Sequence, residues 1–313
     1  MRFIRPTSIG AAQLAASNVP EDDAPAWDVA TAYTAGDQAL VSPYVYEALR
    51  ATTGESPPDN LAGADPAWLR LDNSNRWRMF NRRLGSATVA SEVYASADYA
   101  TDPLDAPAGI AVTVAPGALV DAVAVLEVDA VHIDLIVEDG GTIIYQDRQM
   151  LGSELSESSW WHYFFEPLQR RSEVVWFGLP RTSTATYRVS AYQPGTPGRI
   201  GALVLGEAVE IGQALEGSSI GVLDFSRKEQ DEFGGWDVVQ RAYAREMDIE
   251  FALPFSEVTI VQRYLAEVRA VPVVWQASDA VDATIVYGFI RDWRITISSP
   301  TICFGAMTIE GLT

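Results

Sequence analysis

The sequence predicts a mainly β protein, in which a small β module precedes a jelly-roll-like β-sandwich and a C-terminal α+β domain with one packed helix. Three observations lead to this prediction. Apolar and polar residues alternate with a period of two over long stretches, Pro and Gly interrupt these stretches at regular intervals, and a segment near residue 260 has helical spacing. A length of 313 residues favours two or three domains.

The expected domain boundaries lie in polar segments or segments rich in Pro and Gly. They give an N-terminal arm and linker over residues 1–26, the small module over 27–74, the sandwich over 75–195 and the α+β domain over 196–313. Within the arm, a strand-like segment at 2–9 precedes a linker that is polar, acidic and bounded by Pro.

The small module is expected to consist of a few strands around an aromatic core. Gly36-Asp37 predicts a turn into a strand at 38–41, and the region of Pro43 predicts a second turn into a returning strand at 44–51. A module of this size has little apolar surface to bury, and aromatic rings cover the most surface per residue. We therefore expect its core to contain Trp27, Tyr33, Tyr46 and Trp68.

The order of these residues resembles a known family. The pattern Trp, Tyr-x-x-Gly-Asp, Tyr-x-Ala, Gly-x-x-Pro, Trp resembles the small chitin-type carbohydrate-binding module found on chitinases and in phage tail proteins. In this chain the pattern is carried by Trp27, Tyr33, Gly36, Asp37, Tyr46, Ala48, Gly54, Pro57 and Trp68.

The resemblance implies a glycan site on the module. Its candidate residues are Tyr44, Trp27, Tyr46 and Trp68, and Tyr44, beside Pro43 in the turn, is the best surface aromatic for stacking on a sugar ring. The chain departs from the family after Tyr-x-Ala. Leu49-Arg50 stands where family members usually carry an exposed aromatic pair.

Further segments widen the resemblance to a family of phage tail proteins that carry this module near the N-terminus. These segments are 17–21, 75–80, 224–228, 271–275, 287–289 and 309–312. The resemblance implies a non-enzymatic component of the virion, located in the tail tip or baseplate. Its partners would be other phage tail proteins, copies of itself and host cell-surface polysaccharide.

The sandwich is expected to contain a long hairpin. Val131, Ile133, Leu135 and Val137 face one way, whereas His132, Asp134 and Glu138 face the other, and Asp139-Gly140-Gly141 turns the chain back. The remaining predicted strands lie at 110–114, 122–128, 174–178 and 187–192. The aromatic run at 160–165 favours a buried strand or edge cover over an interface.

The α+β domain is expected to surround its helix with mostly antiparallel strands. The predicted strands lie at 200–205, 208–211, 219–225, 238–253, 273–276, 285–297 and 306–310. Pro254 and Ser256 predict the start of the helix. One helical face would then contain Val258, Val261, Leu265 and Val268.

The charge distribution argues against nucleic acid and favours self-association. The net charge is −20, and such a chain repels phosphate backbones. From 91 to 160 Arg148 is the only cation among thirteen carboxylates, whereas Arg76, Arg78, Arg82 and Arg83 crowd one short segment. Complementary patches of this kind favour contacts between copies, although a solvated acidic face is the simpler interpretation.

The sequence predicts no catalytic, cofactor or metal site. Gly217-Ser218-Ser219-Ile220-Gly221 matches the hydrolase pattern Gly-x-Ser-x-Gly, but a strand-like run follows Ser219 and both histidines precede it. Two distant histidines and the single Cys303 make no zinc or haem pattern. For Asp134, Glu138 and Asp139 we expect a solvated turn in preference to a calcium site. A polysaccharide-acting hydrolase and a secreted glycan-binding protein are the alternative functions.

No export signal or membrane segment is expected. Pro6 interrupts the apolar stretch that a signal peptide would need after Arg2 and Arg5, which favours assembly of a virion protein in the host cytoplasm. The longest apolar run, 109–126, contains Pro116 and Asp121, which a lipid-exposed helix does not tolerate well.

Overall fold

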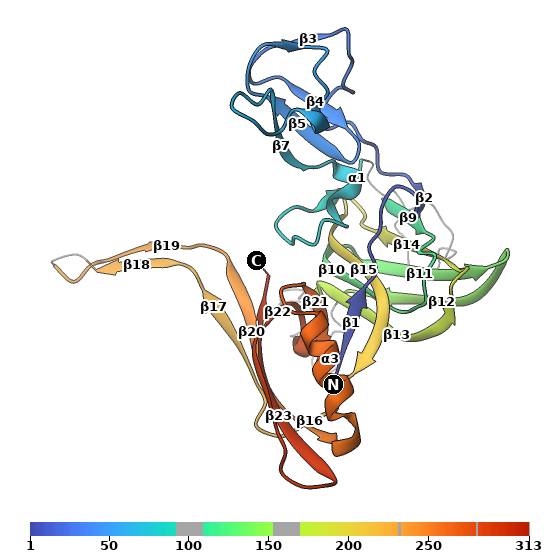
Figure 1. Ribbon diagram of the computed structural model, residues 1–313, viewed down its shortest axis with the longest axis vertical. Coiled ribbons are helices and arrows are strands. Elements are labelled where there is room, and N and C mark those ends of the chain that lie inside the picture. Colours follow the sequence, from blue (N-terminus) through green and yellow to red (C-terminus); the bar gives the residue numbers. More distant parts are fainter. Residues whose placement is uncertain (92–108, 153–169, 231–232, 280, 313) are drawn as a thin grey trace, which may run out of the picture.

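The computed structural model describes residues 1–91, 109–152, 170–230, 233–279 and 281–312, and it is mainly β with one packed helix, as predicted (Figure 1). The strands of its largest sheet are β1 (Arg2–Pro6), β8 (Thr88–Val89), β10 (Val120–Asp129), β13 (Glu173–Thr182), β15 (Arg199–Glu210), β16 (Gln213–Ala214), β17 (Ser219–Asp224), β20 (Tyr243–Pro254), β21 (Val273–Gln276), β22 (Ile285–Thr296) and β23 (Ile302–Gly311). Their order is β13-β10-β15-β1-β21-β22-β23-β20-β16, with β17 paired to β20 and β8 to β15.

A second sheet packs against one end of the first and completes the predicted sandwich. Its strands are β2 (Leu14–Ser17), β9 (Ile110–Val114), β11 (His132–Asp139), β12 (Thr142–Met150) and β14 (Thr186–Tyr192), in the order β12-β11-β14-β9-β2. Val112 of β9, Leu135 of β11 and Val189 of β14 meet Val123 of β10 and Leu203 of β15 in one buried core. The period-two pattern of these strands thus brings their apolar faces together. The aromatic run at 160–165 lies outside the described residues.

The predicted hairpin is confirmed, but its second face is not solvent-exposed. β11 and β12 pair around the turn at Gly140-Gly141, and both glycines have positive φ. Ile133, Leu135 and Val137 enter the core, whereas His132 and Asp134 on the opposite face are also buried. The expected solvated position of Asp134 is therefore wrong, because Arg148 lies directly across the strand pair and neutralises it.

The helix α3 (Val258–Glu267) covers the C-terminal half of the large sheet. The 3-10 turn η2 (Phe255–Glu257) precedes it, so the α-helix starts slightly later than Pro254 and Ser256 suggested. The predicted face is confirmed. Val261, Leu265 and the following Val268 are buried against Met247 of β20 and Trp275 of β21, together with other side chains of these strands.

Two of the predicted strand divisions differ from the structure. The strands expected at 200–205 and 208–211 form the single strand β15, because Gly206 lets the chain pass close to β1 without a turn. The strand expected at 238–253 is divided into β19 (Trp236–Val239) and β20. β19 belongs to a separate ribbon with β18 (Arg227–Gln230), which projects from the end of β17 and β20 (Figure 1).

The strand β1 is the central connection of the large sheet. It pairs antiparallel with β15 on one side and with β21 on the other. Phe3 is buried in the core beneath α3, and Ile4 is buried in a third core on the opposite face of the sheet. The sheet pairing therefore crosses the expected boundary at 195/196 and draws part of the expected N-terminal arm into the body.

The small module stands at one end of the molecule with its own core (Figure 1). It contains β3 (Ala32–Tyr33), β4 (Gln38–Val41), β5 (Tyr44–Ala48), β6 (Thr52–Thr53), β7 (Trp68–Asn73) and the 3-10 turn η1 (Pro57–Asp59). The strand predicted at 38–41 is confirmed as β4, and β5 lies within the one predicted at 44–51. The short helix α1 (Asn75–Arg78) leads from the module into the body.

Ion pairs fix the linker before the module to the helix after it. Arg76 pairs with Glu21 at 3.2 Å, and Arg78 pairs with Asp23 at 2.8 Å. Both carboxylates are largely buried, with side-chain exposures of 15% and 13%. Two of the four clustered arginines are therefore used within the chain, so this cluster is a weaker reason for self-association than the sequence suggested.

None of the helices in the described part of the chain combines the length and hydropathy needed to span a bilayer. The remaining 3-10 turn is η3 (Asp282–Thr284), which precedes β22.

We predict that Gly206→Ala destabilises the protein, because an added Cβ would lie 1.9 Å from the carbonyl oxygen of Arg5 in β1. Overpacking of this kind costs about 1–3 kcal/mol of unfolding free energy. The matched control is Gly221→Ala in β17, where an added Cβ meets nothing within 4 Å. Urea denaturation should separate the two variants. Equal stabilities would show that β1 can move away from β15 without cost.

Candidate interaction sites

Two of the four candidate glycan residues lie inside the module. Trp68 is 1% exposed and donates a hydrogen bond from Nε1 to the Glu55 carbonyl at 2.9 Å. Tyr46 is 3% exposed, and Tyr33 packs edge-on against Trp68 with ring centroids 5.0 Å apart. The expected aromatic core is confirmed for these three residues. The rings of Tyr46 and Trp68 present no face to a ligand in this conformation.

The other two candidates, Tyr44 and Trp27, are half-buried at the edge of this core. The Tyr44 ring contacts Tyr46 edge-on at 6.3 Å between centroids, and the Arg70 guanidinium carbon lies 4.7 Å from the Tyr44 ring centroid. Arg70 thus covers part of one ring face, so a sugar could stack only on the other face of the Tyr44 ring.

Arg50 has a structural role in the small module. Its guanidinium forms a two-point contact with Glu55, at 2.9 and 3.0 Å, and pairs with Asp65 at 3.1 Å. The hydrogen bonds from Arg50, and then that from Thr52, lower the pKa of Glu55. Leu49 beside it is 44% exposed, and Leu69 of β7 is 47% exposed. An ion-pair clamp and an apolar surface therefore occupy this part of the module.

A shallow hollow of about 450 Å³ lies on the module beside Tyr33. Its walls include Thr31, Asp37 and Gln38, and residues 23–26 of the linker form the other side. Asp37 already accepts hydrogen bonds from the amide and the hydroxyl of Thr34 at 2.6 and 2.9 Å. Hydroxyl, carboxylate and amide groups beside an aromatic ring are suitable for a sugar, but the sequence pattern did not single out this hollow.

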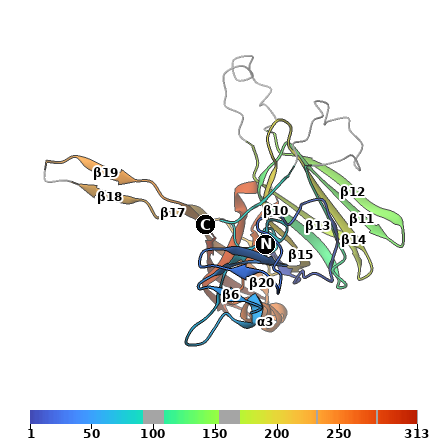
Figure 2. The same cartoon turned by 90° about the horizontal axis from the view of Figure 1, so that it is seen from above.

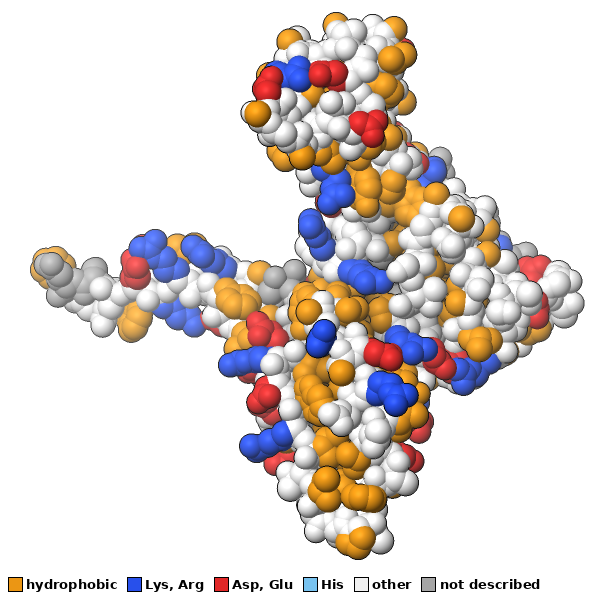
Figure 3. Space-filling view, viewed as in Figure 1, with side chains coloured by type: hydrophobic (Ala, Val, Ile, Leu, Met, Phe, Trp, Pro, Cys, Tyr) orange, Lys and Arg blue, Asp and Glu red, His pale blue; other side chains and the backbone are white. Residues whose placement is uncertain are grey.

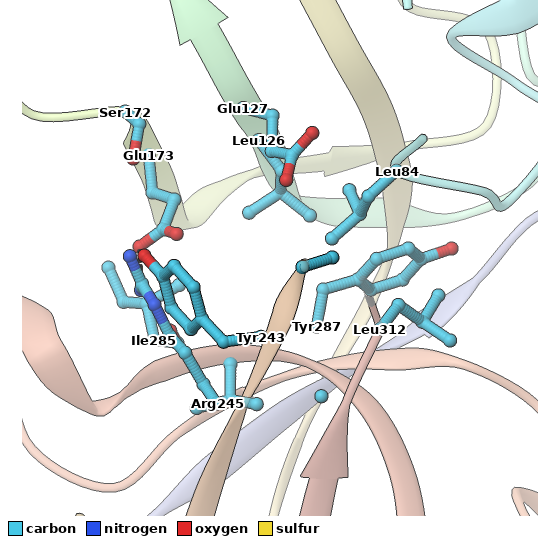
Figure 4. A pocket seen from close by; sticks show the side chains of 13 residues that line it. Leu84, Leu126, Glu127, Ser172, Glu173, Tyr243, Arg245, Ile285, Tyr287 and Leu312 are labelled. Atoms are coloured by element: carbon cyan, nitrogen blue, oxygen red, sulfur yellow. Dashed lines mark hydrogen bonds and ion pairs between the residues drawn. The ribbon is translucent and has the colours of Figure 1, made fainter. Parts of the chain in front are cut away.

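A hollow of the body lies between the sandwich and the C-terminal half of the large sheet. This junction pocket has a volume of about 410 Å³ and includes Leu126, Glu127, Glu173, Tyr243, Arg245 and Leu312 among its walls (Figure 4). Glu127 has a positive φ of 49°, which is uncommon for a residue with a side chain. Its backbone conformation is therefore maintained by the surrounding structure.

The two carboxylates of the junction pocket have different roles. Glu173 accepts a hydrogen bond from Arg245 at 2.6 Å, which ties β13 to β20 across the pocket. Burial raises the pKa of Glu173, and Arg245 opposes this effect. Partial desolvation raises the pKa of Glu127, opposed by Arg199 and Arg245. Because Glu173 is used as a clamp, Glu127 is the acidic group that an incoming ligand would meet.

The sequence patterns that suggested other chemistry fall on ordinary structural positions. Ser219 is the first residue of the exposed strand β17, not part of a strand-to-helix elbow. Asp139 accepts hydrogen bonds from the hydroxyls of Thr182 and Thr184, at 3.1 and 2.7 Å. Among the described residues, no group of three or more His, Cys, Asp and Glu side chains has the arrangement to hold a metal ion.

A buried polar cluster lies on the outer face of the five-stranded sheet. Arg148 donates two hydrogen bonds to Asp134, both at 2.7 Å, and Tyr192 also hydrogen-bonds to this carboxylate. His132 stacks on Tyr192 with ring centroids 4.2 Å apart. Burial, and then the charge of Arg148, lowers the pKa of His132 to about 4. Sequence periodicity placed His132 and Asp134 on one face but gave no sign that the face is buried.

The ribbon of β18 and β19 exposes large apolar side chains. Trp236 is 66% exposed, Val238 56% and Val239 46%, and Phe233 in the turn is 96% exposed. Two views at right angles show the ribbon extending away from the body (Figures 1 and 2). The space-filling view shows hydrophobic side chains at its outer end and around its root (Figure 3). Exposed apolar surface of this kind is typical of protein interaction sites.

No protein-family model and no curated protein matches this chain.

We predict that the protein loses stability as the pH falls from 6.5 to about 4, because the unfolded chain protonates His132 in this range and the folded chain does not. This histidine accounts for up to about 3 kcal/mol, since one pKa unit corresponds to about 1.4 kcal/mol. His132→Gln should flatten the slope of unfolding free energy against pH.

Burial raises the pKa of Asp134, which acts on stability in the opposite sense. The informative quantity is therefore the difference between wild type and His132→Gln, measured by urea denaturation at several pH values. Parallel pH profiles for the two proteins would contradict the prediction.

Proposed function

We propose that this chain is a non-enzymatic structural and attachment component of a bacteriophage tail that assembles with other tail proteins and with copies of itself. The observation that carries the proposal is the exposed apolar ribbon. Trp236 and Val238 are more than half exposed on a projection whose two strands, within the described residues, pair only with each other. A surface that exposes this much apolar area to water is expected to be covered in an assembly.

The modular arrangement is consistent with an attachment role. The small module stands at one end of the molecule, clamped by ion pairs to Arg76 and Arg78, and would be held in a defined direction when the body is built into a particle. Its glycan contact would be made through the partly exposed Tyr44 and Trp27. Such a contact is weak in one copy, and repetition around a tail raises its avidity.

A polysaccharide-acting hydrolase is the second candidate, and one observation favours it. Glu127 and Glu173 share the junction pocket, and burial raises the pKa of both, as a general acid of a glycosidase requires. The direct contact of Glu173 with Arg245 favours the structural role instead. A secreted glycan-binding protein would use the module alone and would leave the ribbon without an assigned function.

We expect an antibody against the small module to label purified phage particles at the tail, and the chain to be present in several copies per particle. Quantitative mass spectrometry of the same particles measures the copy number. Absence of the chain from intact particles would reject the proposal. Hydrolysis of host polysaccharide by wild type, lost in Glu127→Gln, would establish the hydrolase in its place.

We predict that the protein binds chitin oligomers or host surface polysaccharide more weakly than micromolar. Micromolar affinity requires about 8 kcal/mol, and a single contact between a sugar and Tyr44 supplies only a small part of that free energy. Tyr44→Ala should weaken binding at least tenfold, about 1.4 kcal/mol. The matched control is Tyr44→Phe, which keeps the ring that would stack on the sugar. Calorimetric titration measures both variants, and binding unchanged by Tyr44→Ala would place the glycan site elsewhere.

A further inference from the structure

The two faces of the ribbon differ in character. Lys228 lies directly opposite Val238, and Gln230 lies opposite Trp236, so these four side chains share one face. By the same alternation, Val239 shares the other face with Arg227, Glu229 and Asp237. The first face, which we call the apolar face, therefore carries two large apolar side chains and a cation, whereas both carboxylates of these strands lie on the second.

The junction pocket has the complementary character. Leu126, Tyr287 and Leu312 give it apolar walls, and Glu127 and Glu173 give it negative charge. Arg245 neutralises Glu173 at 2.6 Å, so Glu127 remains as the carboxylate that faces an incoming group. Lys228 pairs with Asp224 at 2.6 Å, but both side chains are exposed and such pairs are weak enough to exchange partners.

The pocket of one molecule is out of reach of its own ribbon. Tyr243, the first residue of β20, lines the pocket and lies at the root of the ribbon, while the outer end of the ribbon extends away from the body (Figures 1 and 4). The apolar face can therefore reach such a pocket only in another molecule. Each chain offers one ribbon and one pocket, which is the requirement for a head-to-tail interface.

We propose that the apolar face of the ribbon docks into the junction pocket of a second copy of this chain, and that this contact repeats head to tail. The inference rests on the proposed tail function, which it deepens by naming the partner and the two surfaces. Repetition of one head-to-tail contact gives a closed ring or a helical array, depending on whether the rotation closes. Trp236 and Val238 supply the apolar contact, and Lys228 approaches Glu127.

The sharpest test compares two neighbouring valines. Val238→Ala on the apolar face should weaken self-association at least tenfold, whereas Val239→Ala on the opposite face should change it less than twofold. Sedimentation velocity over a range of concentrations measures both, and circular dichroism confirms that each variant is folded. Equal effects of the two substitutions, or a wild type that stays monomeric at all concentrations, would overturn the inference.

A mixing experiment tests the direction of the contact. The double variant Trp236→Ala/Val238→Ala lacks a functional ribbon but keeps its pocket, and Glu127→Arg/Leu312→Arg blocks the pocket but keeps the ribbon. Each should be monomeric alone, and the mixture should form a one-to-one complex that grows no further. Failure to form this complex, when wild type assembles, would overturn the inference.

The tail function and the docking inference fail separately. Particles that contain the chain, together with a wild type that remains monomeric, would show that the ribbon contacts a different tail protein. That result would reject the inference and leave the proposed function standing. If the chain were absent from particles but assembled through Val238 and Glu127, the proposed function would be rejected and the docking inference would stand.

Discussion

The pairing of β1 with β15 on one side and β21 on the other is the contact on which the rest of the structure depends. It joins the sandwich strands β13, β10 and β15 to the C-terminal strands that pack against α3, and so makes a single sheet from two units. Because successive residues of a strand point to opposite faces, Phe3 closes the core beneath α3 and Ile4 closes the core on the other side. A strand of five residues thereby takes part in two cores.

The boundary between the two halves of the large sheet determines where the junction pocket and the ribbon lie. The junction pocket lies where β10 and β13 of one half meet β20 and β22 of the other, and the ion pairs of Arg245 with Glu173 and Arg171 with Asp282 connect the halves. The ribbon leaves from the same region through Tyr243. At the end of the molecule that carries the small module, partly buried ion pairs at Glu21 and Asp23 hold that module. Pocket, ribbon and module are thus carried on one connected framework.

Much of the local structure could be predicted from the sequence because it depends on neighbouring residues. The alternation at Ile133, Leu135 and Val137 and the glycines of the following turn specify the hairpin without reference to the rest of the chain. The helical spacing of Val261 and Leu265 does the same for α3. In the module, the few aromatic residues available identified Tyr33, Tyr46 and Trp68 as core.

The remaining features depend on contacts between distant parts of the chain. Nothing in residues 2–6 reveals that their partners lie in β15 and β21, and periodicity cannot show that the face of His132 and Asp134 is covered. The junction pocket is assembled from six separate segments, so its residues form no pattern along the sequence. The sequence did not reveal the ribbon because it suggested one strand from 238 to 253, whereas the strand is interrupted at 240–242 and Trp236 and Val238 are exposed.

The position of β1 also has a consequence for synthesis of the protein. The hydrogen bond between Arg2 and Gln276 joins residues 274 positions apart, so β1 leaves the ribosome long before β21 exists. Translation adds about 5–20 residues per second, which leaves Phe3 and Ile4 without their final neighbours for at least about ten seconds. During this interval the nascent chain presents an unpaired apolar strand, which a chaperone would protect from non-native contacts.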